Sequence, residues 1–238
     1  MGVKRPQDIS AESSWRRLCD EVRQTVECVG RRAEEIQIIL VSKTVDEGLI
    51  RAAQQAGAVD FGENRVQELL SKKKNLSPDL RWHLIGHLQT NKVKQVLGQT
   101  VLIHSLDRVE LAEVIDSQAK KLKIPKTDCL IQVNVSGEAS KFGFRPEEVE
   151  PFLASLPADS AVEIRGLMVI GPHTEDEREI RKVFSRARQL QDQLKKKFPI
   201  RNLKTLSMGM SGDWRIAVEE GSTMIRVGSA VFGERNQE

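Results

Sequence analysis

The chain has 238 residues, 39% of them hydrophobic and 30% charged, with a formal net charge of +3. This balance is typical of a soluble globular protein, and the basic runs are too short to suggest a nucleic-acid-binding surface. No apolar run approaches the roughly 20 residues that a membrane helix requires, and residues 1–14 contain no apolar signal core. We therefore expect residues 1–238 to form a single domain in the cytoplasm, bound to neither membrane nor nucleic acid.

The three cysteines, Cys19, Cys28 and Cys129, cannot all pair, and none lies in a CxxC motif. Such a set is typical of a reducing compartment and gives no thiolate metal site. The four histidines show no ligand spacing either, so we expect no bound metal.

Hydrophobic periodicity predicts a first helix that begins at Ser10 and ends near residues 30–33, followed by a regular alternation of strands and helices. The strands are expected at residues 36–41, 59–62, 81–85, 101–105, 129–135, 162–169, 205–207 and 224–227. The helices are expected at residues 45–56, 65–74, 90–97, 107–123, 146–156, 175–198 and 213–220, with Asp107 as the N-cap of its helix. The basic runs 72–74 and 195–197 fall near helix ends, and we expect them to face solvent.

Eight strands, nearly all followed by a helix, indicate parallel βαβ units. In a chain of this length they favour an α/β fold made of one closed (β/α)8 barrel, a TIM barrel, with an extra N-terminal helix. The alternative is an open, doubly wound sheet. That fold usually has fewer strands, and no GxGxxG motif follows the first strand here.

Polar residues follow the strands, at the end of the barrel where such folds place their chemistry. Lys43 follows the first strand and Asn64 the second. Small residues follow the last two strands and could let backbone N–H groups approach a phosphate; they are Ser207, Gly209, Gly228 and Ser229. The simpler alternative is that these residues only form turns and cap helices.

Lys43 comes directly after a buried apolar run, so we expect it at the barrel mouth, partly desolvated and near cations such as Arg226. Both effects favour a neutral amine, which can attack an aldehyde to form a Schiff base. A phosphate cradle opposite this lysine then indicates a phosphorylated aldehyde. The candidates are pyridoxal 5'-phosphate (PLP) and the sugar-phosphate substrate of an aldolase-type barrel.

Several motifs in this chain resemble the pyridoxal 5'-phosphate homeostasis protein family, single-domain relatives of the alanine racemase barrel. The matching stretches are LVSKT at 40–44, FGENRVQE at 61–68, WHLIGHLQTNK at 82–92, GLM at 166–168, LSMGMS at 206–211 and GSTMIRVGSAVFG at 221–233. They occur in family order and span most of the chain. Arg65 and His87 depart from the residues frequent in the family, which are an aromatic and a proline.

The resemblance implies a fold-type III PLP barrel in which Lys43 carries the cofactor as an internal aldimine. It also implies phosphate binding by Ser207, Gly228 and Ser229, with Asn64 lining the pocket beside the ring. Arg226 would face the pyridine nitrogen. Because an arginine stays charged, it would keep that nitrogen unprotonated and restrain carbanion chemistry. Asn91 and Lys141 are weaker candidates near the mouth.

Two functions remain after this assignment. Amino-acid racemisation needs two opposed proton-transfer groups, and in the racemase relatives the second is a tyrosine of another domain. This chain has no tyrosine, and we expect no second domain, although His87 or His173 could in principle serve. We therefore expect a PLP-binding protein that buffers or delivers the cofactor, with PLP-dependent apo-enzymes as its possible recipients. The alternative is a racemase of low activity.

Overall fold

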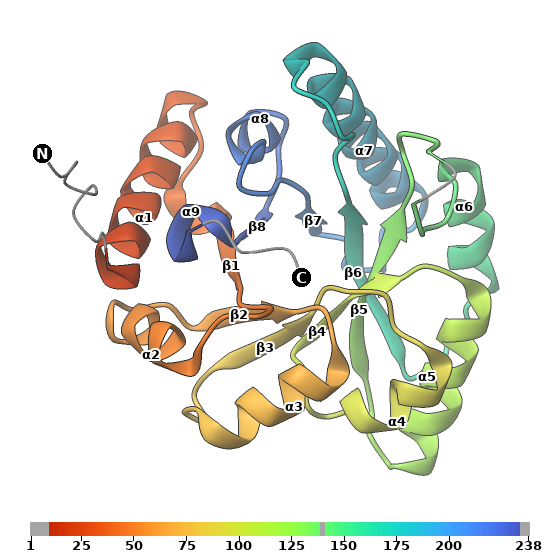
Figure 1. The fold of residues 1–238 in the computed structure, drawn as a ribbon. Helices are drawn as coiled ribbons and strands as arrows, with labels where there is room; N and C mark the ends of the chain where they lie inside the picture. The colour runs from red at the N-terminus through yellow and green to blue at the C-terminus, as the bar shows by residue number, and fades with distance from the viewer. Residues whose placement is uncertain (1–9, 139–140, 234–238) are drawn as a thin grey trace, which may run out of the picture.

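The computed structural model describes residues 10–138 and 141–233, so the polar residues 1–9 lie outside its description. Its eight strands are all parallel and pair in chain order, with β8 returning to β1 (Figure 1). The strands are β1 (Gln37–Val41), β2 (Asp60–Glu63), β3 (Arg81–Leu84), β4 (Leu102–Leu106), β5 (Thr127–Val133), β6 (Val162–Val169), β7 (Thr205–Ser207) and β8 (Met224–Val227). The predicted (β/α)8 barrel is confirmed.

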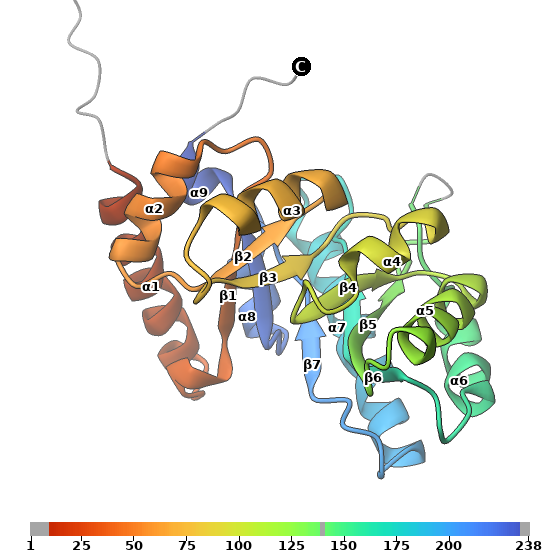
Figure 2. The same ribbon diagram turned by 90° about the horizontal axis from the view of Figure 1, so that it is seen from below.

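Helices surround the barrel. They are α1 (Ala11–Cys28), α2 (Glu47–Gln55), α3 (Val66–Asn75), α4 (Val93–Val96), α5 (Val109–Lys121), α6 (Pro146–Ser155), α7 (Glu177–Lys197), α8 (Trp214–Glu219) and α9 (Ser229–Phe232), with 3-10 turns at Ala33–Glu35 and Thr90–Lys92. In Figure 2 the β7 arrow points towards the end of the barrel where α9 lies. That end carries the carboxyl termini of the strands and is called the mouth below.

The extra N-terminal helix has a clear structural role. The helix after β8, α9, has only four residues and leaves little cover for the adjoining strands. The longer α1 packs against α2, α8 and α9 on this side (Figure 1). Its apolar face, which includes Trp15, Leu18 and Val22, is buried there. The predicted start is also correct, because the Ser10 side chain accepts a hydrogen bond from the Ser13 N–H.

Four local predictions differ from the structure. The expected helix 90–97 divides into a 3-10 turn and the short α4, the strand expected at 129–135 begins at Thr127, and α9 was not expected. Asp107 is not an N-cap, because α5 is capped by Arg108 without a side-chain bond. The Asp107 carboxylate instead lies 2.6 Å from His87 Nδ1 and 2.5 Å from Arg108 Nη1. The Asp107 carboxylate therefore pairs with His87 and Arg108 and does not cap α5.

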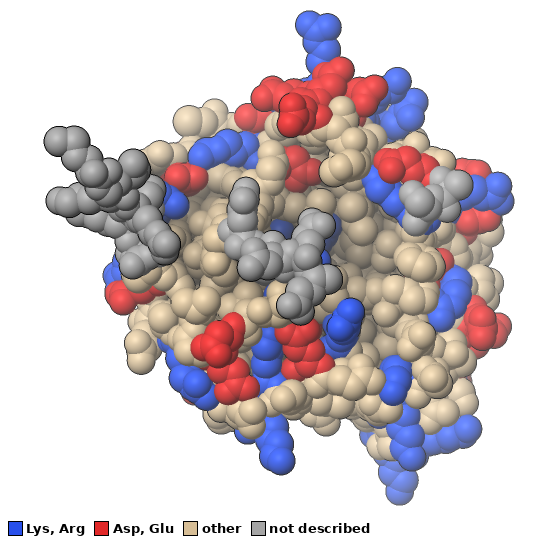
Figure 3. Space-filling model, viewed as in Figure 1, with Lys and Arg blue, Asp and Glu red and all other residues tan. Residues whose placement is uncertain are grey.

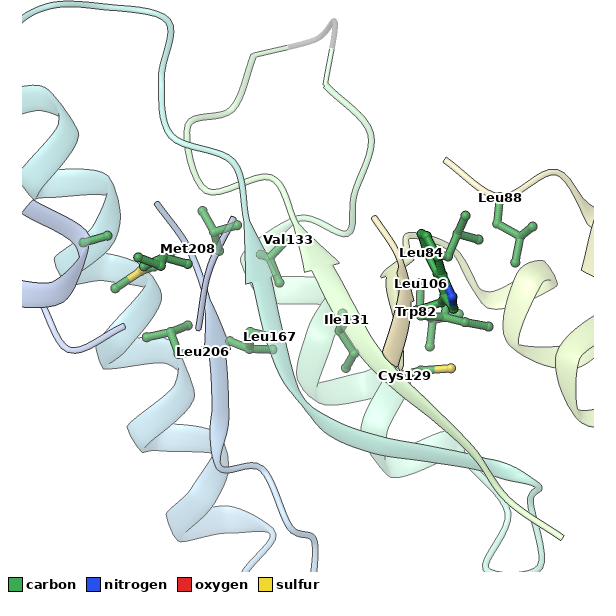
Figure 4. Packing of buried hydrophobic residues seen from close by; sticks show 14 of the residues in the cluster. Trp82, Leu84, Leu88, Leu106, Cys129, Ile131, Val133, Leu167, Leu206 and Met208 are labelled. Carbon is green, nitrogen blue, oxygen red and sulfur yellow. The ribbon is translucent and has the colours of Figure 1, made fainter. Parts of the chain in front are cut away.

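The core has two layers, as alternation along barrel strands requires. The inner layer contains a small apolar cluster of Ile39, Leu102, Leu130, Met168 and Met224. The outer layer lies between the strands and the helices and contains the large cluster shown in part in Figure 4. Each strand residue therefore faces either the barrel interior or the helices.

Gly166 explains one of the sequence motifs. Its φ is +150°, and a Cβ at this position would lie 1.8 Å from the Thr205 carbonyl oxygen. Glycine is needed here because the backbones of β6 and β7 approach closely. Within residues 10–138 and 141–233, no helix is long and apolar enough to cross a membrane.

Candidate functional site

Closure of the barrel gathers the predicted site residues. Lys43 follows β1, which pairs with β2 on one side and β8 on the other. Asn64 follows β2, while Ser207 ends β7 and Arg226 lies within β8. Ile39 of β1 is level with Arg226, so Lys43 lies four residues further towards the mouth. Figure 3 shows this face hollowed near its centre, with blue atoms of Lys or Arg visible inside the hollow.

Lys43 lies in a tight turn directly after β1. Its neighbour Thr44 has a φ of 59°, a left-handed conformation that is uncommon for a residue other than glycine. The Thr44 N–H donates a 2.6 Å hydrogen bond to Glu68 Oε1 of α3, which holds this turn in place. Lys43 itself is exposed, so the desolvation expected from the sequence is not present.

A buried cluster of ionic side chains supports this turn from behind. The Lys72 ammonium of α3 donates to the Ser42 carbonyl oxygen at 2.6 Å, to Glu63 Oε1 at 2.9 Å and to Glu68 Oε1 at 2.6 Å. The Ser42 hydroxyl also donates to Glu63 Oε1, at 2.6 Å. Since these bonds fix the residues before and after Lys43, we name Ser42, Glu63, Glu68 and Lys72 the lysine-turn clamp.

The clamp corrects the expectation that residues 72–74 are solvated. Lys72 is only 6% exposed, because its partners lie in the turn after β1, in β2 and in α3. Burial raises the pKa of Glu63, although the hydrogen bonds from Ser42 and Lys72 act in the opposite direction. Lys73 is also engaged, donating to the Gln99 carbonyl oxygen at 2.7 Å.

Arg226 lies inside the barrel and is 4% exposed. Its Nη1 donates to Ser207 Oγ at 2.7 Å and its Nη2 to the Val169 carbonyl oxygen at 3.0 Å. Burial lowers the pKa of Arg226 to about 10, an effect that the nearby Asp213 carboxylate opposes. The guanidinium therefore remains a cation at neutral pH, held at the base of the mouth.

Polar side chains continue from Ser207 along the barrel interior. His104 Nδ1 lies 3.3 Å from Ser207 Oγ, and His104 Nε2 lies 3.1 Å from His83 Nδ1. His83 Nε2 lies 3.0 Å from Asp60 Oδ1. Arg81 holds the same carboxylate through two hydrogen bonds, of 2.8 and 2.5 Å. A continuous row of polar groups thus joins Arg226 to the opposite end of the barrel.

The loops after β7 and β8 bring hydroxyl and amide groups together. The Gly228 N–H donates to Ser211 Oγ at 3.2 Å, and Ser229 is exposed at the start of α9. Gly209 has a φ of +97°, and a Cβ there would lie 2.6 Å from the Ala217 methyl group. Gly209 therefore allows the loop after β7 to lie close to α8.

Asn64 is placed by close backbone packing. A Cβ on Gly86 would lie 2.4 Å from the Asn64 carbonyl oxygen, so the loop after β3 approaches Asn64 only because residue 86 is glycine. Asn64 is half-buried at the rim of the mouth. This contact explains the glycine of the WHLIGHLQTNK motif.

The weaker candidates have other partners. The His87 ring stacks on Phe142 with centroids 4.1 Å apart, which joins the loops after β3 and β5. Lys141 donates to Glu138 Oε1 at 2.6 Å and to the Gly171 carbonyl oxygen at 2.8 Å. Asn91 is exposed in a 3-10 turn. Among the described residues, no group of three or more His, Cys, Asp or Glu side chains could hold a metal ion.

Comparison with known proteins agrees with this geometry. The family model for the alanine racemase N-terminal domain matches residues 19–236. The pyridoxal phosphate homeostasis protein of Aquifex aeolicus is 42% identical over 220 residues, which cover 92% of this chain and 96% of that protein. The chain belongs to the pyridoxal phosphate homeostasis protein family.

Solved structures give the same assignment. PipY of Synechococcus elongatus PCC7942, solved with PLP bound, has a TM-score of 0.79 and 38% identity, covering 89% of this chain and all of that one. An alanine racemase of Clostridium difficile 630 has a TM-score of 0.71 at 14% identity, covering 92% of this chain and 57% of the racemase. The second likeness concerns the fold alone.

Two groups of residues at this site were not predicted. Glu63 and Glu68 of the lysine-turn clamp belong to the FGENRVQE motif. Their acidic side chains were a signal in the sequence that a cation could be buried nearby. The interior row draws on Asp60, His83 and His104, which all occupy inward-facing positions of their strands. Polar residues at such positions are a signal that the strand pattern already contained.

Proposed function

We propose that this protein binds PLP through Lys43 and holds it for buffering or delivery to PLP-dependent apo-enzymes. One observation carries the proposal: Lys43 follows β1, and β1 pairs with β8, the strand that bears the buried cation Arg226. An amine and a guanidinium on neighbouring strands match the two ends of a pyridine aldehyde. The naming of the family and the PLP-bound structure of PipY support the same cofactor.

The donor chemistry of the site fits this group. PLP supplies an aldehyde that condenses reversibly with a primary amine, and Lys43 offers that amine at the mouth. Ser207 lies beside Arg226, and Asn64 stands at the rim. Hydroxyl and amide donors after β7 and β8, including those of Gly228 and Ser229, suit a phosphate. The lysine-turn clamp would keep the amine in place without touching the cofactor.

The cation at Arg226 favours a function in binding PLP over a function in catalysing reactions of amino acids. A guanidinium that stays charged would donate to the pyridine nitrogen of bound PLP and keep that nitrogen unprotonated, so the ring would withdraw electrons weakly. Proton abstraction from a bound amino acid is then restrained. Racemisation would further require a second acid–base group opposite Lys43. His87 is committed to Asp107 and Phe142, which does not suit it to that role.

A cytoplasmic location fits the cysteines. Cys19, Cys28 and Cys129 are all unpaired thiols, as expected in a reducing compartment.

Covalent trapping tests the proposal. The purified chain is incubated with PLP, reduced with borohydride and digested, and the modified peptide is identified by mass spectrometry. We expect the label on Lys43 in the parent and in Lys141→Ala, and its loss in Lys43→Ala. A label on many surface lysines, unaffected by Lys43→Ala, would overturn the proposal. Exchange of the α-proton of alanine in D2O at the rate of a true racemase would instead support the enzyme alternative.

A further inference from the structure

The interior row of polar groups consists of Arg226, Ser207, His104, His83 and Asp60. Their chemistry determines which atom of each hydrogen-bonded pair carries the proton. Arg226 can only donate, so Ser207 Oγ must accept from it at 2.7 Å. A serine hydroxyl has one proton, and His104 Nδ1 lies within reach of it at 3.3 Å. His104 is fully buried. Burial, together with the neighbouring Arg226 cation, holds its pKa well below 6.5, so the ring is neutral.

Asp60, at the far end of the row, sets the direction in which the hydrogen bonds are donated. The Asp60 carboxylate can only accept, and it is 5% exposed. It already receives two hydrogen bonds from Arg81, so its charge is balanced before His83 contributes anything. A second cation at His83 would lie in the same barrel interior as Arg226, where its side chain is 1% exposed. A neutral His83 that donates from Nε2 to Asp60 satisfies every partner without adding charge.

We propose that Asp60, His83 and His104 are positioning residues that hold the Ser207 hydroxyl, and through it Arg226, in a single hydrogen-bonded orientation. The donors run one way, from Arg226 to Ser207, His104, His83 and finally Asp60. Both imidazoles are neutral and carry their proton on Nε2. The inference deepens the proposed function, and it depends on that function only where Arg226 acts on bound PLP.

The order determines what Ser207 can do. Its proton points to His104 and one of its lone pairs is taken by Arg226, so no proton remains for a phosphate oxygen. Ser207 therefore acts on the cofactor through Arg226. If His83 were instead a cation, His104 would donate from Nδ1 and the Ser207 proton would be released towards the mouth. The two orders make opposite predictions for the same side chain.

The row ends at a cavity that solvent can enter. A cavity of about 310 Å³ lies at the amino-terminal ends of the strands, lined in part by Asp60, Arg81 and His83. Arg81 is the outermost member, with 53% of its side chain exposed. Bulk solvent thus reaches the Asp60 end, while the His104 end is closed.

Nitrogen-15 NMR of the imidazoles tests the proton order directly. The chain has only four histidines, so selective labelling gives a simple spectrum, assigned with His83→Gln and His104→Gln. In the full-length protein, with and without added PLP, we expect two neutral rings protonated at Nε2. A cationic His83, or a proton on Nδ1 of His104, would overturn the proposal. This result is independent of PLP binding, so it separates the inference from the proposed function.

A double-mutant cycle tests the positioning role. Ser207→Ala and His104→Leu should each raise the Kd for PLP about tenfold, as expected for hydrogen bonds to a charged group, and should move the absorbance of the bound cofactor. The two effects should not add, because both variants act through Arg226. Met168→Leu, in the same inner layer, should leave both readouts unchanged. Fully additive losses, or an unchanged absorbance in both variants, would contradict the proposal.

Discussion

Lys72 Nζ lies 2.9 Å from Glu63 Oε1, with 8% of the lysine side chain and none of the glutamate side chain exposed. The pair lies directly behind the strand end that carries Lys43. Glu63, Glu68 and Lys72 together hold the turn that bears Lys43, the residue that we propose to bind PLP. Glu63 Oε2 has no hydrogen-bond partner among the described residues, so this buried carboxylate is compensated at Oε1, by the charge of Lys72 and by the Ser42 hydroxyl.

Removal of this cation should therefore be costly. We expect Lys72→Met to lower the free energy of unfolding by about 3–5 kcal/mol, because it leaves Glu63 and Glu68 without their cation. Lys74→Met is the matched control, since Lys74 is exposed on the same helix, and it should change stability by less than about 0.5 kcal/mol. Urea denaturation measures both. Equal stability of the two variants would show that the clamp is not a stabilising feature.

Gly86 should be required by the close approach of Asn64. A methyl group at residue 86 would lie 2.4 Å from a backbone oxygen, so Gly86→Ala must shift the loop. We expect a loss of about 1–3 kcal/mol in stability and weaker PLP binding. At Gly212, after β7, nothing lies within 4 Å of an added Cβ, so Gly212→Ala serves as the control. Similar behaviour of the two alanine variants in thermal melts and PLP titrations would refute this account of the motif.

The buried imidazole should make stability depend on pH. His104 is neutral when folded, whereas an unfolded histidine binds a proton below about pH 6.5. Stability should therefore fall as the pH drops from 6.5, by up to about 1.4 kcal/mol per pH unit for this group. The groups that face it are His83, Arg226 and Ser207.

The expected result is a flatter profile between pH 6.5 and 5 for His104→Gln than for the parent, measured by denaturation at each pH. Exposed His173 provides the control, and His173→Gln should keep the parental slope. Asp60 adds a second acid-sensitive step at lower pH. Burial alone would raise the pKa of Asp60, but bonds from His83 and Arg81 outweigh it and lower that pKa, so its contribution is lost as the pH falls further. An unchanged slope in His104→Gln would contradict the buried, neutral assignment.

The sequence predicted those features that local pattern determines. The strand pattern predicted the barrel, and the position of Lys43 after the first strand predicted that it lies near Arg226, whereas the role of Asn64 was implied only by the resemblance to the family. The sequence did not predict α9, because four residues are too few for a helical period to appear. Nor did it predict that Lys72 is buried. A run of three lysines at a helix end resembles a solvated surface, and only the packing of α3 against β2 and the turn after β1 distinguishes the first lysine from the other two.

Absorbance of the protein during titration with PLP tests the central claim most directly. We predict that the parent and Lys141→Ala develop a new visible band distinct from that of free PLP, and that Lys43→Ala retains the spectrum of the free aldehyde. A band of equal intensity in Lys43→Ala would show that the cofactor is attached elsewhere. Absence of any new band in the parent would contradict the proposal that Lys43 binds this cofactor.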